Sequence, residues 1–158
     1  MFQQLFHNKI LLSAIIAWGV AQVLKAIIYW IRNKHFDLSR LFGDGGMPSG
    51  HSATVAALAT ACGIEFGLDS FQFAISGILA VIVMHDASGV RLESGKQAKA
   101  INEITMFLRK DMLKTNVKEM FNHTANMQKL KELLGHTPMQ VYVGMTVGIL
   151  VAFLMYIK

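Results

Sequence analysis

Cysteine and charge are both scarce in this sequence, and each scarcity excludes a class of protein. The single cysteine, Cys62, rules out an intramolecular disulfide and a zinc site built from cysteines. Charged residues make up 16% of the 158 positions, whereas an average soluble domain has roughly 25%. This composition excludes a disordered, collagen-like or charge-rich coiled-coil protein.

Apolar residues are abundant instead. They make up 53% of the chain, and the mean hydropathy is +0.42. The chain is long enough for one domain, and one soluble domain of this size could not bury so much apolar surface. We therefore expect a membrane protein.

Four hydrophobic runs, each with short polar extensions, are suited to cross a bilayer as helices. The expected spans are 10–31, 50–66, 70–86 and 138–157. The first ends in Tyr29 and Trp30, which are typical interfacial anchors. The fourth carries no charge and contains Gly144 and Gly148. This small-residue spacing favours close helix packing, with incidental glycines as the equal alternative.

The polar third of the chain lies between the third and fourth spans. Apolar residues recur there at three- and four-residue spacing over residues 95–122, which predicts an amphipathic helix. Lys99, Glu103 and Lys110 would face outward. The expected fold is an all-α integral membrane bundle of about four transmembrane helices with this amphipathic segment, forming a single domain over residues 1–158.

Basic residues are unevenly distributed among the loops. Twelve of the fifteen lysines and arginines fall in the loops 32–50 and 86–137, and the opposite side has Lys9 and Lys158. The positive-inside rule predicts that both basic loops face the cytoplasm and both termini lie outside the cell membrane. A phosphate-binding site in these loops would also concentrate lysines and arginines there, and it is the alternative explanation of this distribution. We expect no nucleic-acid partner, because basic and aromatic residues are not interleaved.

The first basic loop ends at a histidine that lies at an expected helix start. Residues 45–52 read GGMPSGHS, in which glycines allow close backbone approach and proline and serine favour a helix N-terminus. His51 then lies where free backbone N–H groups and the helix dipole attract an anion. A helix cap beside a solvated histidine is the alternative.

A second histidine occupies the same kind of position at the fourth span. His136 is followed by Thr137, an expected N-cap, and by Pro138, which suits the first helical turn. Both histidines lie on the same membrane face, so two helix N-termini can converge on one anion. Histidine can act there as a nucleophile or a general acid near neutral pH.

Charged residues accompany these histidines. Lys25 lies inside the first span, where a charge is costly and indicates a function unless the side chain snorkels to the interface. Its presence, and the lack of a small-residue cleavage site, argue against a cleaved signal peptide. Asp86 and Arg91 lie near the same face, where a cap and a topogenic charge are the ordinary roles. No histidine or carboxylate cluster has metal-ligand spacing, so we expect no metal.

Residues 46–53, GMPSGHSA, resemble the P-S-G-H motif of the type 2 phosphatidic acid phosphatase superfamily, which includes membrane lipid phosphatases and vanadium-dependent haloperoxidases. The spacing of its last motif is matched by His136, Pro138, Val141 and Gly144. The whole chain is similar to a small divergent bacterial branch of that superfamily, usually labelled acid phosphatase/vanadium-dependent haloperoxidase-related.

The chain also departs from the superfamily pattern. Leu130 and Gln140 stand where the last motif has arginine and aspartate. The first motif, in which a lysine precedes an arginine–proline pair, has no match. The superfamily usually has six spans, and four are expected here.

The resemblance implies hydrolysis of a lipid phosphate or diphosphate, without a cofactor. His136 would attack phosphorus to form a phosphohistidine, and His51 would protonate the leaving oxygen. Asp86 would orient a histidine in place of the missing aspartate. The groups expected to hold the phosphoryl charge are Lys25, Arg40, Ser49, Gly50, Arg91 and Lys96.

Two other functions stay open from the sequence. One is a catalytically inactive membrane protein that binds phospholipid or a partner through its basic loops. The other is a haloperoxidase, which would need bound vanadate and whose known relatives are largely soluble. A shared phosphate site predicts imidazoles ~6–8 Å apart, from N–H···O lengths. A much larger separation between His51 and His136 would require a homodimer to complete the site.

Overall fold

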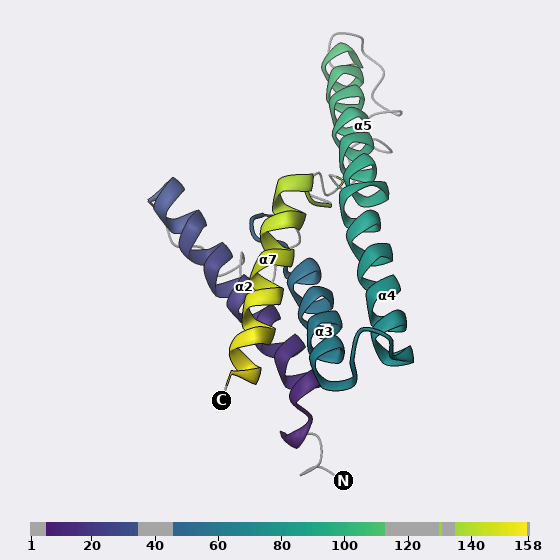
Figure 1. Ribbon diagram of the computed structural model, residues 1–158. Helices are drawn as coiled ribbons and strands as arrows, with labels where there is room; N and C mark the ends of the chain where they lie inside the picture. Colours follow the sequence, from purple (N-terminus) through teal and green to yellow (C-terminus); the bar gives the residue numbers. More distant parts are fainter. Residues whose placement is uncertain (1–5, 35–45, 113–129, 131–134, 158) are drawn as a thin grey trace.

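The computed structural model describes residues 6–34, 46–112, 130 and 135–157. In these ranges the structure is helical throughout, apart from turns, and contains no strand, which confirms the all-α class (Figure 1). The principal helices are α2 (Lys9–Asn33), α3 (Gly50–Phe66), α4 (Phe71–Ser88), α5 (Val90–Met112) and α7 (Pro138–Tyr156). The four expected spans coincide with α2, α3, α4 and α7 to within two residues at every boundary.

Short polar side chains set the helix starts. Asn8 accepts a hydrogen bond from the Leu11 amide at 3.0 Å, which caps α2. Ser49 caps α3 by accepting from the Ser52 amide, and Ser70 caps α4 in the same way. Each cap satisfies one of the backbone N–H groups that a helix start leaves without a partner.

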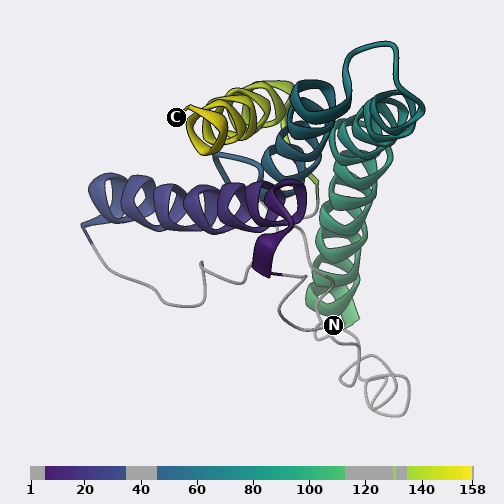
Figure 2. The ribbon, with the colours of Figure 1, turned by 60° about the horizontal axis from the view of Figure 1, so that its bottom comes forward.

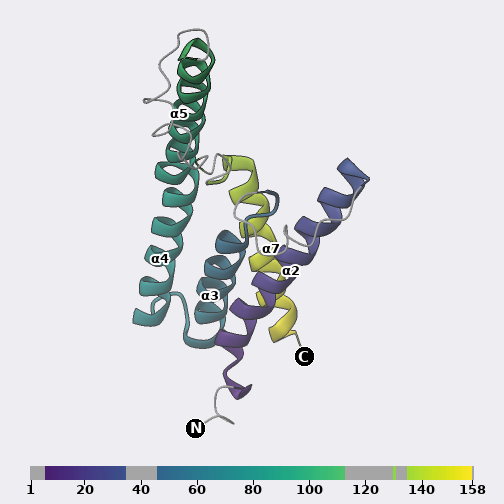
Figure 3. The ribbon, with the colours of Figure 1, turned by 180° about the vertical axis from the view of Figure 1, so that it is seen from behind.

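Helix α3 is the centre of the bundle and packs against α7, α2 and α4 (Figures 1 and 3). Its contact surface is built from alanines, which let the helix backbones approach closely. The buried core consists of Ala17, Ala21, Ala53, Ala57, Ala61, Val151 and Ala152. A core of such small side chains puts the large apolar residues on the outside of the bundle.

Two glycines of α7 bring that helix against α3. A Cβ atom at Gly144 would overlap the Ser49 carbonyl, and one at Gly148 would overlap the Ala53 carbonyl. The small-residue spacing in α7 is therefore a helix-packing face, and its interpretation as incidental glycine is wrong.

The outer surface of the bundle is apolar. Ile15, Ile78, Val81 and Leu154 are all more than half exposed. By length and composition, the segments Lys9–Asn33, Phe71–Phe107 and Pro138–Tyr156 are suited to cross a membrane. The fourth helix, α3, has 17 residues, at the short end of the range for a spanning helix. The molecule is an all-α membrane bundle.

The helix ends divide the bundle into two faces. Helix α2 begins and α7 ends at one end, whereas α2 ends, α3 begins, α4 ends and α7 begins at the other (Figure 1). The starts of α3 and α7 therefore share one end of the molecule. We call this end the histidine face, because His51 and His136 lie on it.

Helix α5 begins earlier than expected. It starts at Val90, directly after Gly89, and continues α4 beyond the bundle (Figures 1 and 2). The expected start near residue 95 is wrong, because the only break is the Gly89 junction, where the amide still donates to the His85 carbonyl. Lys99 and Glu103 are exposed, as expected. Residues 113–122 of the expected helix, and the Lys110 side chain, lie outside the described part.

Candidate phosphate site at two helix starts

The structure brings His51 and His136 together. Their ring centroids lie 6.5 Å apart with the ring planes tilted by 59°. This separation is within the ~6–8 Å expected for two imidazoles sharing one phosphate. Both rings belong to one chain, so no histidine from a second copy is needed to form the pair. His51 is exposed at the start of α3, and His136 is buried, with 5% of its surface exposed.

The position of His136 is fixed by the loop that precedes α7. Its backbone amide donates to the Ala87 carbonyl at 2.8 Å. Gly135 has a φ of +76° and lies against the backbone of Arg91 and Leu92, where a Cβ atom would overlap. Only glycine meets both conditions without strain. The position of His136 is therefore set by its contacts with the backbone at the α4–α5 junction.

Gln140 fixes the tautomer of His136. Its side-chain Oε1 accepts a hydrogen bond from the Thr137 amide at 3.1 Å and lies 3.3 Å from His136 Nδ1. The Thr137 N–H requires an acceptor, so the atom between the two groups is the amide oxygen. His136 Nδ1 must then carry the proton, which leaves the lone pair of the neutral ring on Nε2.

The surroundings of His136 favour its neutral form. Burial lowers the pKa of His136 below its ordinary value of 6.5, and the positive charges of Lys25 and His51 lower it further. The hydrogen bond to Gln140 and the backbone of Gly46 oppose this shift without cancelling it. A neutral imidazole with a free Nε2 lone pair is the nucleophilic form of histidine.

The start of α3 is joined to the start of α7. The buried Ser49 donates its backbone N–H to the Gln140 carbonyl at 3.0 Å. Its hydroxyl accepts hydrogen bonds from the amide and the hydroxyl of Ser52. Gly50 is also buried, and a Cβ there would lie 3.1 Å from Gln22 Nε2. Two helix N-termini thus converge beside the paired histidines, where an anion is favoured.

Lys25 approaches this site from α2. Only 6% of its surface is exposed, so the side chain is buried in the bundle and does not extend to the surface. A Cβ at Gly46, whose φ is +92°, would lie 3.3 Å from the Lys25 stem. The positive charge of Lys25 is one of the causes that lower the pKa of His136.

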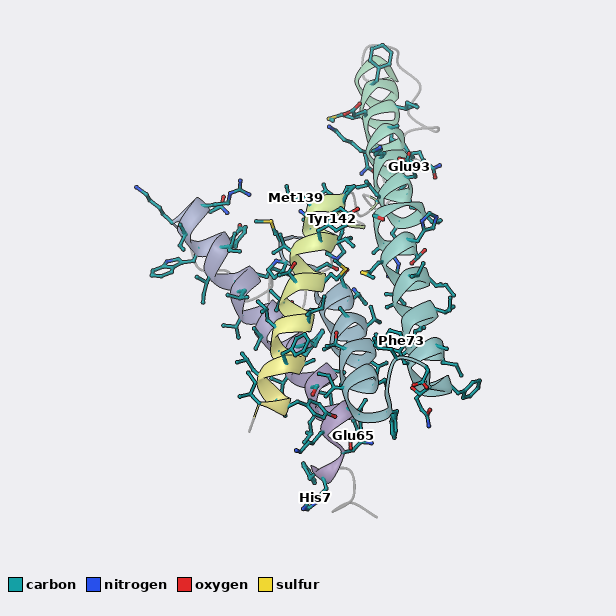
Figure 4. All side chains as sticks on the ribbon, in the orientation of Figure 1. His7, Glu65, Phe73, Glu93, Met139 and Tyr142 are labelled. Atoms are coloured by element: carbon teal, nitrogen blue, oxygen red, sulfur yellow. The ribbon has the colours of Figure 1, made fainter. Side chains whose placement is uncertain are left out.

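Other expected site residues are directed elsewhere. Arg91 Nε donates to Asp86 Oδ2 at 2.6 Å, and both side chains are substantially exposed. Asp86 therefore pairs with Arg91, and Gln140 is the residue in contact with His136. Lys96 pairs with Glu93 at 2.7 Å on α5. Glu93 lies beyond the start of α7 (Figure 4). The remaining candidate, Arg40, lies outside the described residues.

Two further residues at the site come from α2 and were not predicted from the sequence. Trp18 and Gln22 both lie against Gly50, and Gln22 Oε1 is buried without a hydrogen-bond partner among the described residues. Gln22 precedes Lys25 by three positions, which places both on one helix face. The three-residue spacing of a glutamine and a lysine in an otherwise apolar span would have predicted that this face of α2 contributes to the site. Within the described ranges, no group of three His, Cys, Asp or Glu side chains is arranged to hold a metal ion.

Comparisons with known sequences identify the family of this membrane bundle. The model of the Divergent PAP2 family matches residues 6–151, and the chain belongs to this family. The chain is also 44% identical over 158 residues to the uncharacterized membrane protein YuiD of Bacillus subtilis (strain 168), covering 96% of each chain. No solved structure matches it.

Proposed function

We propose that this protein is a membrane phosphatase that hydrolyses a lipid phosphate or diphosphate through a phosphohistidine intermediate. The observation that carries the proposal is the 6.5 Å separation of the His51 and His136 rings at two joined helix starts. Membership of the Divergent PAP2 family supports the reaction class. The buried charge of Lys25 supports an anionic substrate.

In the first step, His136 Nε2 attacks phosphorus. The P–N bond forms while the bond from phosphorus to the leaving oxygen breaks, and His51 donates a proton to that oxygen. In the second step, His51 takes a proton from water, whose oxygen attacks phosphorus as the P–N bond breaks. Inorganic phosphate leaves, and both histidines return to their starting protonation states.

The transferring phosphoryl group carries negative charge, and the site supplies fixed positive groups for it. Helix starts leave backbone N–H groups without intrahelical partners, and α3 and α7 begin beside the two histidines. Lys25 adds a full charge from a buried position, where it is screened little by water. Preorganised groups of this kind contribute the largest share of catalysis in many enzymes.

Phosphohistidine trapping is the direct test. The purified protein is mixed with a lipid phosphate carrying ³²P, quenched, and analysed for acid-labile, alkali-stable label. We expect label on the wild type and none on His136→Ala. His51→Ala should retain phosphate binding but slow labelling by ~10²–10⁴-fold, the usual contribution of a general acid. His85→Ala, which removes an exposed histidine of α4, is the matched control and should label normally.

A phospholipid-binding protein without turnover is the second candidate, and Gln140 favours it. A neutral amide beside His136 cannot stabilise an imidazolium by charge, as a carboxylate would. Under this alternative, inorganic phosphate protects the site from modification by a histidine reagent, but no phosphohistidine forms. The same trapping experiment therefore separates the two functions.

We further propose that the histidine face lies on the cytoplasmic side of the cell membrane, which follows from the distribution of basic residues. In a Cys62→Ala background, single cysteines are placed at Lys96 on α5 and at Leu68 in the α3–α4 turn, both exposed. An impermeant thiol reagent added to whole cells should label position 68 and leave position 96 unlabelled. The reverse pattern would overturn the orientation.

A further inference from the structure

A groove in the membrane-spanning part of the bundle begins at His51. Its volume is about 370 Å³, and its walls come from α2, α3 and α4. The residues that line it are Ala14, Ile15, Trp18, His51, Thr54, Val55 and Val83. The Thr54 hydroxyl is already bonded to the Gly50 carbonyl at 2.8 Å. The groove is therefore apolar along its length, with one imidazole at the end nearest the phosphate site.

The proposed reaction indicates which part of the substrate would enter this groove. In a displacement at phosphorus, the leaving oxygen lies opposite the attacking atom. With His136 as nucleophile, the leaving oxygen lies at His51, which is the residue shared by the phosphate site and the groove. The carbon attached to that oxygen is then directed to the groove.

We infer that the groove binds one apolar chain of the leaving alcohol, so that the substrate lies with its phosphate between the histidines and its chain along α3. This inference rests on the proposed function. Two features of the groove itself support it. Two of its three walls, α2 and α4, belong to segments suited to cross a membrane, and two of its lining residues, Ile15 and Trp18, are exposed on the outer surface. A chain already in the bilayer can therefore enter sideways.

Trp18 provides a reporter inside the groove. The chain has two tryptophans, so Trp30→Phe leaves Trp18 as the single fluorophore. The protein in nanodiscs is given tetradecyl phosphonate carrying a doxyl quencher on its chain, which cannot be hydrolysed at its C–P bond. Tetradecanol with the same label is the comparison. We expect the phosphonate to quench Trp18 at least threefold more than the alcohol at equal mole fraction.

A pair of substitutions on α4 tests the location. Val83→Phe fills the groove, whereas Val81→Phe adds the same bulk to a residue that is 61% exposed on the outer surface. Val83→Phe should reduce the phosphonate signal to the alcohol level, and Val81→Phe should leave it unchanged. If Val83→Phe does not fold, Ile15→Phe fills the groove from α2, at a residue whose exposure tolerates bulk.

Turnover gives the second measurement. Val83→Phe should lower kcat/KM for tetradecyl phosphate about tenfold and leave hydrolysis of butyl phosphate unchanged. Two results would overturn the groove as the chain-binding site. One is equal quenching of Trp18 by the phosphonate and the alcohol, and the other is an equal loss of kcat/KM for both phosphate esters in Val83→Phe. Quenching specific to the phosphonate in a protein that hydrolyses neither ester would support the groove as the chain site and overturn the proposed phosphatase.

Discussion

The two ends of the bundle each carry a histidine and a lysine, and they differ in how the helices meet. The end opposite the histidine face has a cavity of about 490 Å³ lined by His7, Lys9, Glu65 and Tyr156, among others. His7 and Glu65 mark this end in Figure 4. This end contains a histidine and a lysine, as the histidine face does. Lys9 lies over the Tyr156 ring, 5.6 Å from its centroid.

The difference lies in the helix starts. At the histidine face, α3 and α7 begin side by side, joined by the Ser49–Gln140 backbone hydrogen bond. At the other end α2 and α4 begin, and these two helices do not pack against each other in the described structure. Positive helix ends therefore converge at one end alone. The presence of a histidine and a lysine does not distinguish the two ends, whereas the adjacency of helix starts does.

The largest expected effect comes from removing one histidine at each end. His136→Ala should lower turnover of a lipid phosphate by at least a thousandfold, because it removes the nucleophile. His7→Ala should leave turnover within twofold of the wild type. Steady-state release of phosphate measures both. Comparable losses in the two variants would mean that the ends are equivalent and would remove the basis for the site.

A lysine exchange at each end should give the second-largest effect. Lys25→Met removes a buried charge near the imidazoles and should lower kcat about 10²–10³-fold, the usual loss for one preorganised group. Lys9→Met should have little effect on kcat. Insertion and thermal unfolding are checked in parallel, and near-normal kcat in Lys25→Met would exclude the lysine from phosphate binding.

The packing of α7 on α3 should give a smaller, structural effect. Gly144→Ala forces a methyl group against the Ser49 carbonyl, at a cost of about 1–3 kcal/mol for overpacking. Gly77→Ala is the control, because its added methyl group meets no atom within 4 Å. Thermal unfolding should show a lower Tm for Gly144→Ala and an unchanged or higher Tm for Gly77→Ala. The reverse order would contradict the close contact.

The smallest effect concerns the pKa of His136. Because burial and the charges of Lys25 and His51 lower it, the ring stays neutral at pH values below 6.5, where an ordinary histidine becomes protonated. Lys25→Met removes one positive charge and should raise the pKa of His136. A titration of labelled histidine by NMR, assigned with His136→Ala, measures the change. An unchanged or lower value would place the Lys25 charge away from the ring.

Local chemistry made most of the fold predictable. The helix starts at Gly50 and Pro138 follow from Ser49 and Thr137, and the long apolar runs fix the helices that come after them. The separation of His51 and His136 followed from placing two helix starts on one face. Gln140 was visible as a departure from the expected aspartate, but its contact with the Thr137 amide is a detail of the first helical turn.

Tertiary geometry set the features that the sequence did not predict. Arg91 was expected beside the histidines, yet α5 continues α4 and so directs Arg91 along the helix surface to Asp86. The backbone of Arg91, which lies against Gly135, is what supports His136. Gln22 was missed because its environment depends on where α2 crosses the start of α3. Neither the direction of Arg91 nor that crossing can be obtained from residue spacing.

The site is recessed along α2. Gly50, at the start of α3, lies against Trp18, and α2 continues from there to Asn33, about 22 Å of further helix. A protein built this way would meet its substrate within the leaflet instead of from water. Its rate should then follow the mole fraction of the lipid in the membrane, so that diluting the lipid with inert phospholipid slows the reaction even at constant bulk concentration. The relevant substrate concentration would then be the one in the plane of the membrane. Only the released phosphate would enter the aqueous phase.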